Sequence, residues 1–563
     1  MEKPRLASIA LPAGGLLALT IAVHFIFSPL GFNPTDDGFT LAYSRRLLEG
    51  EVPHRDFIII RPALSPLLHV PEVWLGGEHT YWISRLVFWL QLAVISFVWT
   101  LLITEALGLR QTPLRLFGIS VLAFAASQNF ATLVWHTVDG LFLVTLGVFL
   151  CTRQPPRRLD VPGYLLIGAA YLTKQSFLFL GPAALVLLGH HRRPSAWAAW
   201  LAPGVLYVAF LIVAGGLDDA FEQLTSQRDL FEAGIRQYLQ VLVLAGFLAG
   251  LVAGFATYSE RKLPFFSGSL DWQRLAGIAL LAAFIGGTGL AMAGDRYASQ
   301  EVYALFGAAG GLAAYRLVAA RHRIQEASFR YEAAISLLVL ISAWSVSISV
   351  GDRTPALAGG ALLALIATQA LRAGDSLSFA WRPLGAVAAP AMIVIAAGAV
   401  GVGWVRENAH YVYRDRPASE LSYSLGGVFP GGGLIKTNAS TYAFLEDLEQ
   451  AIEKSGPGRY AIVPDLPGYW AKARQRNPLP VDWPQSIELK SAALVERVVD
   501  SLESQRGDTT VIAQKISAEF LSEGFVELTN GPRFGAEHYS GLLAHVRNTW
   551  QKVGETRFFE LYR

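Results

Sequence analysis

Long apolar runs follow one another over the first 404 residues of this 563-residue chain, separated by short polar stretches. A helix that crosses a membrane needs about 20 mainly apolar residues, and about thirteen runs reach or approach that length. The pattern therefore predicts an all-α polytopic membrane bundle over residues 1–404. Two short runs are interpreted as broken helices that meet at Thr173 and Lys174. The runs lie at 6–30, 81–104, 114–130, 134–151, 162–173, 176–189, 196–216, 238–257, 274–293, 301–319, 331–350, 355–371 and 384–404.

The pattern changes after residue 404, where the chain becomes polar. Strand-like runs at 460–463 and 509–512 alternate with helix-like runs at 440–454 and 491–504. Such alternation is typical of a small α/β domain. Residues 405–563 are therefore predicted to form a domain that faces water.

Composition agrees with a membrane protein, since 53% of the residues are hydrophobic, 16% are charged and the mean hydropathy is +0.38. The net charge of +2 gives no basic field that would favour nucleic acid. The single cysteine, Cys151, excludes a disulfide within the chain. The N-terminal run at 6–30 follows basic residues but lacks a small-residue cleavage site, so we interpret it as an uncleaved first span.

The distribution of Lys and Arg predicts the orientation, because cytoplasmic loops are enriched in these residues. With the N-terminus in the cytoplasm, the inside segments hold about twice as many Lys and Arg residues as the outside loops. An odd number of spans then places the domain at 405–563 outside. Residues 31–80 become the first external loop.

Two adjacent acids, Asp36 and Asp37, lie in this loop directly after the first span. Carboxylates are costly to place near lipid, so such acids often mark a site that faces water or substrate. They are therefore candidates for a catalytic acid or base. The alternative is that they cap a short helix starting near Phe39, because acids favour helix N-termini.

Other candidates come from later loops on the same side. Asp139 is either a helix-start residue or a second site acid, and His136, one turn before it, is either a metal ligand or a cap. Lys174 interrupts an apolar stretch, where it would meet a lipid phosphate or else extend to water or pair with a local acid. Arg353 suits a phosphate because of its planar fork, but with Asp352 it also fits an ordinary turn.

Arg55 and Arg61 lie in a proline-rich part of the first loop that is expected to form short helical pieces. Both are candidates for binding substrate, although for each of them we favour a structural role, such as the pairing of Arg55 with Asp56 or another neighbour. The sequence has no spaced His, Cys and Asp cluster, so no metal site is predicted and a divalent metal stays an open alternative. No glycine-rich phosphate loop is present, which is consistent with a donor that is not a nucleotide.

Several of these motifs together resemble the GT-C superfamily of integral-membrane glycosyltransferases, in particular bacterial relatives of protein O-mannosyltransferases and of the lipid A aminoarabinose transferase. The resemblance rests on Asp36, Asp37 and Gly38, on LLEGEVPHRDF, and on Arg61 with the proline after it. GAAYLTKQS at 168–176 is similar to a Gly-Leu-Ala-x-Leu-Thr-Lys segment of the family, and the ending ETRFFELYR is similar to that of many members. The family commonly has Asp-Glu where this chain has Asp-Asp.

The resemblance implies inverting transfer of a sugar from a polyprenyl-phosphate donor to a glycan, lipid or protein acceptor, on the outer face of a bacterial inner membrane. It implies that Asp36 or Asp37 is the general base and that Lys174 and Arg353 hold the donor phosphate. The resemblance also places a second loop acid at Asp139, which leaves Asp139, His136, Arg55 and Arg61 as candidates for binding substrate. No cofactor is required by this chemistry. The alternatives are a transporter or lipid flippase, a polysaccharide polymerase or ligase, and a noncatalytic scaffold.

Overall fold

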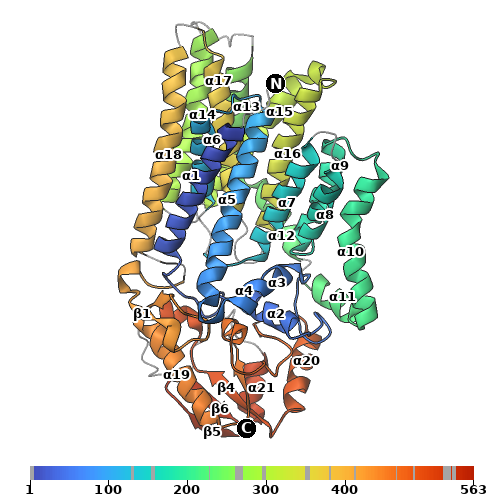
Figure 1. Ribbon diagram of the computed structural model, residues 1–563, viewed down its shortest axis with the longest axis vertical. Helices are drawn as coiled ribbons and strands as arrows, with labels where there is room; N and C mark the ends of the chain where they lie inside the picture. The colour runs from blue at the N-terminus through green and yellow to red at the C-terminus, as the bar shows by residue number, and fades with distance from the viewer. Residues whose placement is uncertain are drawn as a thin grey trace.

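Two parts of the chain lie end to end along the long axis of the molecule, a bundle of helices and a smaller region of helices and strands (Figure 1). The N-terminal helix begins at the end of the bundle that is far from the smaller region. The computed structural model describes the chain except for residues 1–5, 128–131, 154–158, 227–228, 260–269, 295–298, 349–354, 379–381, 411, 413, 465, 486–487, 524–533 and 535–540.

Each apolar run of the sequence coincides with a helix of the bundle. The two short runs form a helix and a 3₁₀ turn followed by a helix, with an irregular break at Thr173 and Lys174. The bundle consists of α1 (Leu6–Phe27), α5 (Thr80–Ala106), α6 (Pro113–Ala126), α7 (His136–Thr152), α8 (Asp160–Ala170), η2 (Gln175–Phe179), α9 (Leu180–Leu187), α10 (Pro194–Ala214), α13 (Val241–Tyr258), α14 (Leu270–Gly294), α15 (Ser299–Ala319), α16 (Ala327–Ser347), α17 (Gly359–Asp375) and α18 (Arg382–His410).

Eight helices in the described part of the chain are long and apolar enough to cross a membrane, which confirms a polytopic helical membrane protein. They are α1, α5, α10, α13, α14, α15, α16 and α17. The helices α6, α7 and α9 are shorter, because a bilayer core about 30 Å thick needs about 20 helical residues. The count of about thirteen spans stays a prediction.

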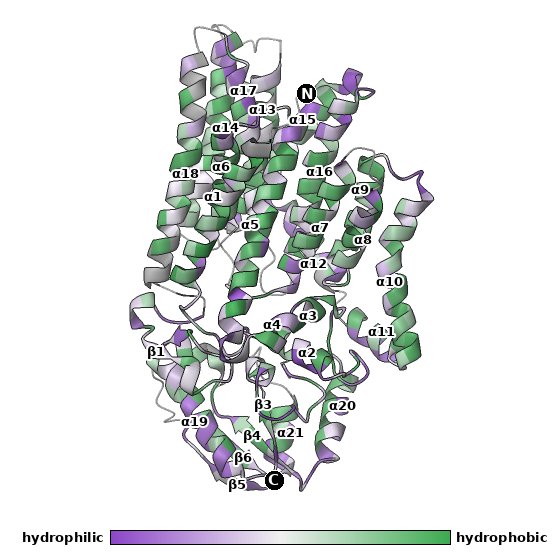
Figure 2. Cartoon of the chain, viewed as in Figure 1, coloured by the Kyte–Doolittle hydropathy of each residue, from purple (hydrophilic) through white to green (hydrophobic). Residues whose placement is uncertain are grey.

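Apolar residues cover the bundle and give way to polar ones in the smaller region (Figure 2). The helix α17 is almost wholly buried among its neighbours, whereas most of α10 is exposed. Exposed side chains on α10 include Leu206 and Val213. Apolar surface of this kind is what lipid would cover.

Glycines bring α13 and α15 into close contact. A Cβ at Gly246 would lie 2.1 Å from the Ala304 carbonyl oxygen, and one at Gly311 would lie 2.0 Å from that of Phe247. Small residues at such spacing let helix backbones approach inside a membrane. The sequence therefore specifies a tight seam between these two helices.

Short helices fill the predicted first external loop. They are α2 (Phe39–Leu48), α3 (Leu64–Leu68) and α4 (Val70–Leu75), and a further pair, α11 (Leu217–Thr225) and α12 (Asp229–Arg236), follows α10. The prolines of the loop break it into pieces as the sequence predicts. Because α2 is buried on most sides, it forms the floor between the bundle and the smaller region.

The C-terminal region, residues 412–563, contains a four-stranded mixed sheet of order β3-β4-β6-β5. The pair β3 and β4 is parallel, and the other two pairs are antiparallel. The predicted strand and helix runs of this region are all present. Its elements are β1 (Tyr423–Ser424), β2 (Lys436–Thr437), α19 (Ala439–Ser455), β3 (Arg459–Val463), η8 (Pro467–Ala471), α20 (Ala492–Glu503), β4 (Thr509–Gln514), α21 (Gly541–Thr549), β5 (Lys552–Glu555) and β6 (Phe559–Tyr562).

Candidate functional site

A tight turn before α2 positions the two adjacent acids. The side chain of Asn33 accepts hydrogen bonds from the backbone N–H groups of Thr35 and Asp36, at 3.0 and 2.8 Å. The N-cap of α2 is Gly38, and among the described residues no side chain caps this helix. The capping interpretation of Asp36 and Asp37 is therefore wrong. The turn directs the two carboxylates to different partners.

The Asp37 carboxylate is held by a backbone group of the loop and by an arginine of α5. One carboxylate oxygen accepts from the Asn33 backbone N–H at 2.8 Å, and both oxygens lie 3.3 Å from Nη2 of Arg85 on α5. Arg85 also donates to the backbone carbonyls of Ser28 and Gly31. Burial raises the pKa of Asp37, while Arg85 opposes that rise. Asp37 therefore helps to hold the end of the first span against α5.

Asp36 has a different environment. Its side chain is also buried, but it forms an ion pair of 2.8 Å with Arg414. The Arg414 side chain is 41% exposed, so this pair lies at the border with solvent. An exposed ion pair opens more readily than a buried one. The two acids are equally buried, and they differ in that the partner of Asp36 reaches solvent whereas Arg85, the partner of Asp37, is itself buried.

A hollow lies beside the start of α2 and encloses about 240 Å³ of empty space, part of it open to solvent. Its walls combine apolar residues such as Phe39 and Ile59 with polar side chains from four segments of the chain. The polar ones are Thr40, Tyr43, Arg61, Ser65, His136 and Thr173.

The polar wall atoms that have no hydrogen-bond partner among the described residues include Oγ1 of Thr40 and Nδ1 of His136, both on buried residues. Leaving a buried donor or acceptor unsatisfied costs about 1–3 kcal/mol, so such groups usually meet water or a ligand. These atoms therefore offer hydrogen-bond partners to water or to a polar group of a ligand at the hollow.

The C-terminal region contacts two wall residues of the hollow. Trp483 stacks on Phe39 with ring centroids 5.0 Å apart. Arg61 donates from Nη1 to Oε1 of Glu488 at 3.0 Å, and the Glu488 carboxylate is fully buried. Burial raises the pKa of Glu488, although Arg61 opposes this. The C-terminal region thus helps to hold Phe39 and Arg61 in place.

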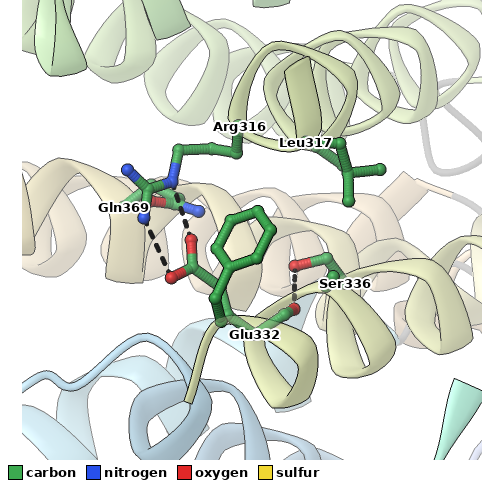
Figure 3. Close-up of a pocket in the computed structure, with 8 residues that line it drawn as sticks. Arg316, Leu317, Glu332, Ser336 and Gln369 are labelled. Atoms are coloured by element: carbon green, nitrogen blue, oxygen red, sulfur yellow. Dashed lines mark hydrogen bonds and ion pairs between the residues drawn. The ribbon is translucent and has the colours of Figure 1, made fainter. Parts of the chain in front are cut away.

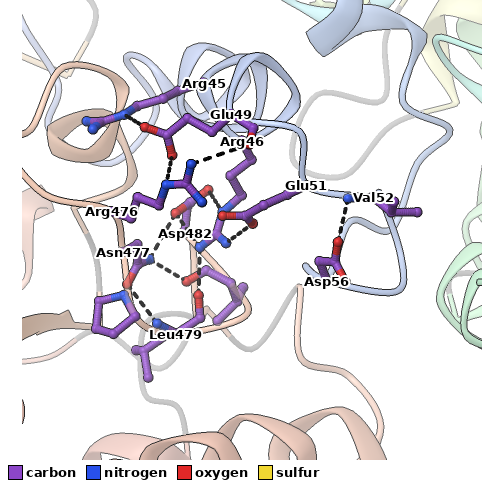
Figure 4. Close-up of polar contacts among 12 residues, drawn as sticks. Arg45, Arg46, Glu49, Glu51, Val52, Asp56, Arg476, Asn477, Leu479 and Asp482 are labelled. Atoms are coloured by element: carbon purple, nitrogen blue, oxygen red, sulfur yellow. Dashed lines mark hydrogen bonds and ion pairs between the residues drawn. The ribbon is translucent and has the colours of Figure 1, made fainter.

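Further polar contacts hold the first external loop against the C-terminal region (Figure 4). Nε and Nη2 of Arg46 donate to the two Asp482 oxygens at 2.6 and 2.9 Å, and Nη2 also donates to the Leu479 carbonyl. Arg45 donates to the carbonyls of Trp470 and Ala473. Such paired bonds from a planar guanidinium set orientation as well as distance. They hold α2 against the C-terminal region.

Asp139 lies directly behind the hollow and has several partners. Ser65 donates to Oδ2 at 2.6 Å, Gln91 donates to Oδ1 at 2.7 Å, and Nε2 of His69 lies 3.1 Å from Oδ1. Nδ1 of His69 in turn lies 2.8 Å from Glu72. Asp139 is fully buried and in the first turn of α7. It orients a wall residue, Ser65, instead of entering the hollow.

Lys174 is buried at the break between α8 and η2. Its Nζ donates to Oγ1 of Thr137 and to the carbonyl of Val346, both at 3.2 Å. The residue before it, Thr173, lines the hollow. The structure therefore places Lys174 beside the start of α7, and its predicted role in binding phosphate stays a prediction.

Two predicted residues do not join this group. Arg55 pairs with its neighbour Asp56 at 2.7 Å on the surface, which is the pairing favoured from the sequence, and it does not line the hollow. Arg353 lies outside the described residues. The described residues also contain no group of three His, Cys, Asp or Glu side chains arranged to hold a metal ion.

The residues that the sequence interpretation missed are Thr40, Tyr43, Ser65, Arg85, Arg414 and Glu488. Thr40 lies four positions after Asp36, so closeness to the acids in the sequence was a usable signal, although Asp36 itself precedes α2. The partners Arg85 and Arg414 carry no such signal, because they come from α5 and from beyond α18.

Comparisons with protein-family models, curated proteins and solved structures found no match for this chain.

Proposed function

We propose that this protein is a membrane glycosyltransferase that moves a sugar from a polyprenyl-phosphate donor to a cell-envelope acceptor. The observation that carries the proposal is the hollow with unsatisfied polar atoms at the start of α2, whose wall residue Thr40 lies four positions after Asp36. A buried cation, Lys174, lies beside it. The resemblance to GT-C glycosyltransferases gives the same assignment.

The reaction needs a general base, and we assign that role to Asp36. Its carboxylate would accept the proton of the acceptor hydroxyl as the hydroxyl oxygen attacks the anomeric carbon. The bond between that carbon and the phosphate oxygen breaks, and polyprenyl phosphate leaves with the bonding electrons. Attack from the face opposite the leaving group inverts the configuration. Asp37 is less suited, because Arg85 and the Asn33 N–H occupy its oxygens.

The leaving phosphate needs positive charge at the membrane end of the hollow. Lys174 is placed for this, because its contacts Thr137 and Val346 are on α7 and α16 at the end of the bundle near the C-terminal region. Arg61 adds a guanidinium in the wall of the hollow. Preorganised donors at a developing charge are an effective source of catalysis. Arg353 remains a candidate for the same role.

The proposed setting is the inner membrane of a bacterium, crossed about thirteen times. The N-terminus would lie in the cytoplasm and the C-terminal region outside, as the distribution of Lys and Arg predicts. The acid pair and the hollow then face the outer surface, where lipid-linked sugars are used. The lipid tail of the donor would lie against the exposed apolar helices.

The test is transfer of labelled sugar by the purified full-length protein from a panel of polyprenyl-phosphate sugars, with an envelope extract as acceptor. Asp36→Asn should abolish transfer while the protein remains folded. Asp56→Asn is the matched control, since it removes a carboxylate from the same loop but outside the hollow. Full transfer by Asp36→Asn would disprove the assignment of the base. Absence of transfer from every donor would favour transport or flipping of a lipid.

A further inference from the structure

A glycine-rich loop of the C-terminal region, residues 431–436, is hydrogen-bonded to the ends of two helices that are long and apolar enough to cross a membrane. The backbone N–H of Lys436 donates to the carbonyl of Pro29 at 2.7 Å, two residues after α1 ends. The backbone N–H of Gly433 donates to the carbonyl of Glu78 at 2.6 Å, two residues before α5 begins. The loop therefore lies at the level where α1 ends and α5 begins.

The end of α1 carries apolar side chains on its surface. Phe25 and Ile26, both in the last turn, are exposed. The Phe25 ring packs against Trp82 in the first turn of α5, with ring centroids 5.5 Å apart. Aromatic side chains gather where the hydrocarbon of a membrane meets water. We therefore expect lipid to cover this end of α1 and to reach the level of the glycine-rich loop.

Charged side chains mark the opposite end of the bundle. Arg316 near the end of α15 donates to both oxygens of Glu332, in the second turn of α16, at 2.7 and 2.9 Å (Figure 3). Arg372 in the last turn of α17 donates to the same carboxylate at 3.2 Å. Charges are costly inside hydrocarbon, so three charged groups at helix ends fit one boundary of the apolar band. The glycine-rich loop lies near the other boundary.

Within the loop, the side chain of Leu434 points outward. It is 52% exposed, whereas the next residue, Ile435, is fully buried in the apolar core of the C-terminal region. Leu434 has φ +67°, a left-handed conformation that costs a residue with a Cβ about 1–2 kcal/mol. Lys436, two positions further on, is exposed as well. The fold thus presents an apolar and a cationic side chain at the level of the membrane boundary.

Two further apolar side chains are exposed just before α5. Trp74 and Leu75 are the last residues of α4, and the apolar span that contains α5 begins at Gly77. The Lys472 ammonium donates to the carbonyl of Val73 at 3.0 Å, which ties this end of α4 to the C-terminal region. Tryptophan is common at membrane interfaces, because its ring is apolar while its N–H seeks a polar partner. Trp74 therefore fits the same boundary as the glycine-rich loop.

We propose that the glycine-rich loop and the end of α4 insert into the lipid leaflet on the side of the C-terminal region. Leu434, Trp74 and Leu75 enter the edge of the hydrocarbon, and the Lys436 ammonium extends to lipid phosphates. The bilayer is the occupant, because the loop is bonded to the ends of α1 and α5 and the exposed end of α1 continues the apolar surface. This contact fixes the C-terminal region at the membrane surface, and it does not depend on the proposed transfer of a sugar.

The test measures the surroundings of a nitroxide spin label on the full-length protein in phospholipid nanodiscs. Cys151→Ala removes the native cysteine, and Leu434→Cys introduces a single site for the label. Oxygen concentrates in hydrocarbon and a neutral nickel chelate in water, so the ratio of their collision rates reports which of the two surrounds the label. Val553→Cys is the matched control, because Val553 is 51% exposed on β5, at the end of the C-terminal region far from the bundle (Figure 1). The label at position 434 should give a several-fold higher ratio of oxygen to nickel collisions than the label at position 553.

Trp74→Cys examines the same surface at a second position, so the result does not depend on how well one variant folds. Its label should also give a high ratio, and melting curves that match the unlabelled parent protein check the fold. Equal ratios at positions 434 and 553 would overturn the proposal, because water would then surround the loop. Slow collisions with both reagents at position 434 would overturn it too, because protein and not lipid would then cover Leu434.

Discussion

Arg46 on α2 and Asp482 in the C-terminal region are joined by two short hydrogen bonds across a gap of 436 positions in the sequence. Both side chains are almost fully buried, at 7% and 1% exposed. Because Trp483 follows Asp482 and stacks on Phe39, this pair also fixes one wall of the hollow. The ion pair therefore couples the association of the two parts to the shape of the site.

Removing one member of this pair should destabilise the protein strongly. Arg46→Gln leaves the Asp482 carboxylate buried without its counter-charge, and such a loss costs about 3–5 kcal/mol. We expect a clearly lower melting temperature for the detergent-solubilised protein and faster proteolysis of the C-terminal region. Arg476→Gln is the control, since its ion pair with Glu49 is 59% exposed on the arginine side and should be worth about 0–1 kcal/mol. Equal effects of the two substitutions would contradict this account.

Asp36→Asn and Asp37→Asn should separate activity from stability. Loss of a general base lowers the rate about 10²–10⁴-fold, so Asp36→Asn should reduce transfer by that factor with little change in melting temperature. Asp37→Asn should lower the melting temperature, because it removes the buried carboxylate that pairs with Arg85. Transfer rates and melting curves of both variants check this. If Asp37→Asn reduces transfer and Asp36→Asn lowers the melting temperature instead, Asp37 is the base.

The sequence could identify this pair of acids but not divide their roles. Adjacency and position after the first span were visible in the sequence, whereas the partners Arg85 and Arg414 come from distant segments. Asp139 was likewise recognised as unusual, yet its contact with His69 depends on how α7 meets the loop. Residues that share a helix can be placed by spacing, and residues that meet through tertiary packing cannot.

The fold shows the same contrast between what the local sequence predicts and what tertiary packing decides. Apolar length predicts where helices form, so every run became a helix, from α1 to α18. Length alone does not say how far a helix extends through a bilayer, and α6 and α7 are shorter than the runs suggested. The mutual approach of the loop and the C-terminal region depends on pairs such as Arg61 and Glu488, which no local pattern reveals.

His69 should make the stability of the protein depend on pH. Burial alone would lower its pKa, but the carboxylates of Asp139 and Glu72 outweigh burial and raise the pKa of His69 to about 10. The unfolded value is about 6.5, so between these values the folded protein keeps a proton that the unfolded chain releases. The stabilisation is fully present below pH ~6.5 and is lost as pH rises toward ~10, by up to about 1.4 kcal/mol per pH unit.

Melting temperatures measured from pH 6 to pH 10 test this expectation. The wild-type protein should lose stability with rising pH more steeply than His69→Gln, which cannot carry the proton. His79→Gln, a substitution of an exposed histidine in the 3₁₀ turn η1 (Gly77–His79), is the control and should keep the wild-type slope. Parallel curves for wild type and His69→Gln would show that His69 is not protonated in the folded protein.

Gly38→Ala should disrupt the site through the backbone. Gly38 has φ +91°, and a Cβ there would lie 2.3 Å from the Tyr81 hydroxyl and 2.9 Å from the Gly468 Cα. The first contact can shift with a side chain, but the second is backbone of the C-terminal region, so α2 and η8 must move apart.

Gly50→Ala is the matched control, because Gly50 has φ +84° and open space around it. It should cost only about 1 kcal/mol from backbone strain. We expect Gly38→Ala to lower the melting temperature several times more and to reduce transfer along with it; equal losses in the two variants would show that only the backbone angle matters.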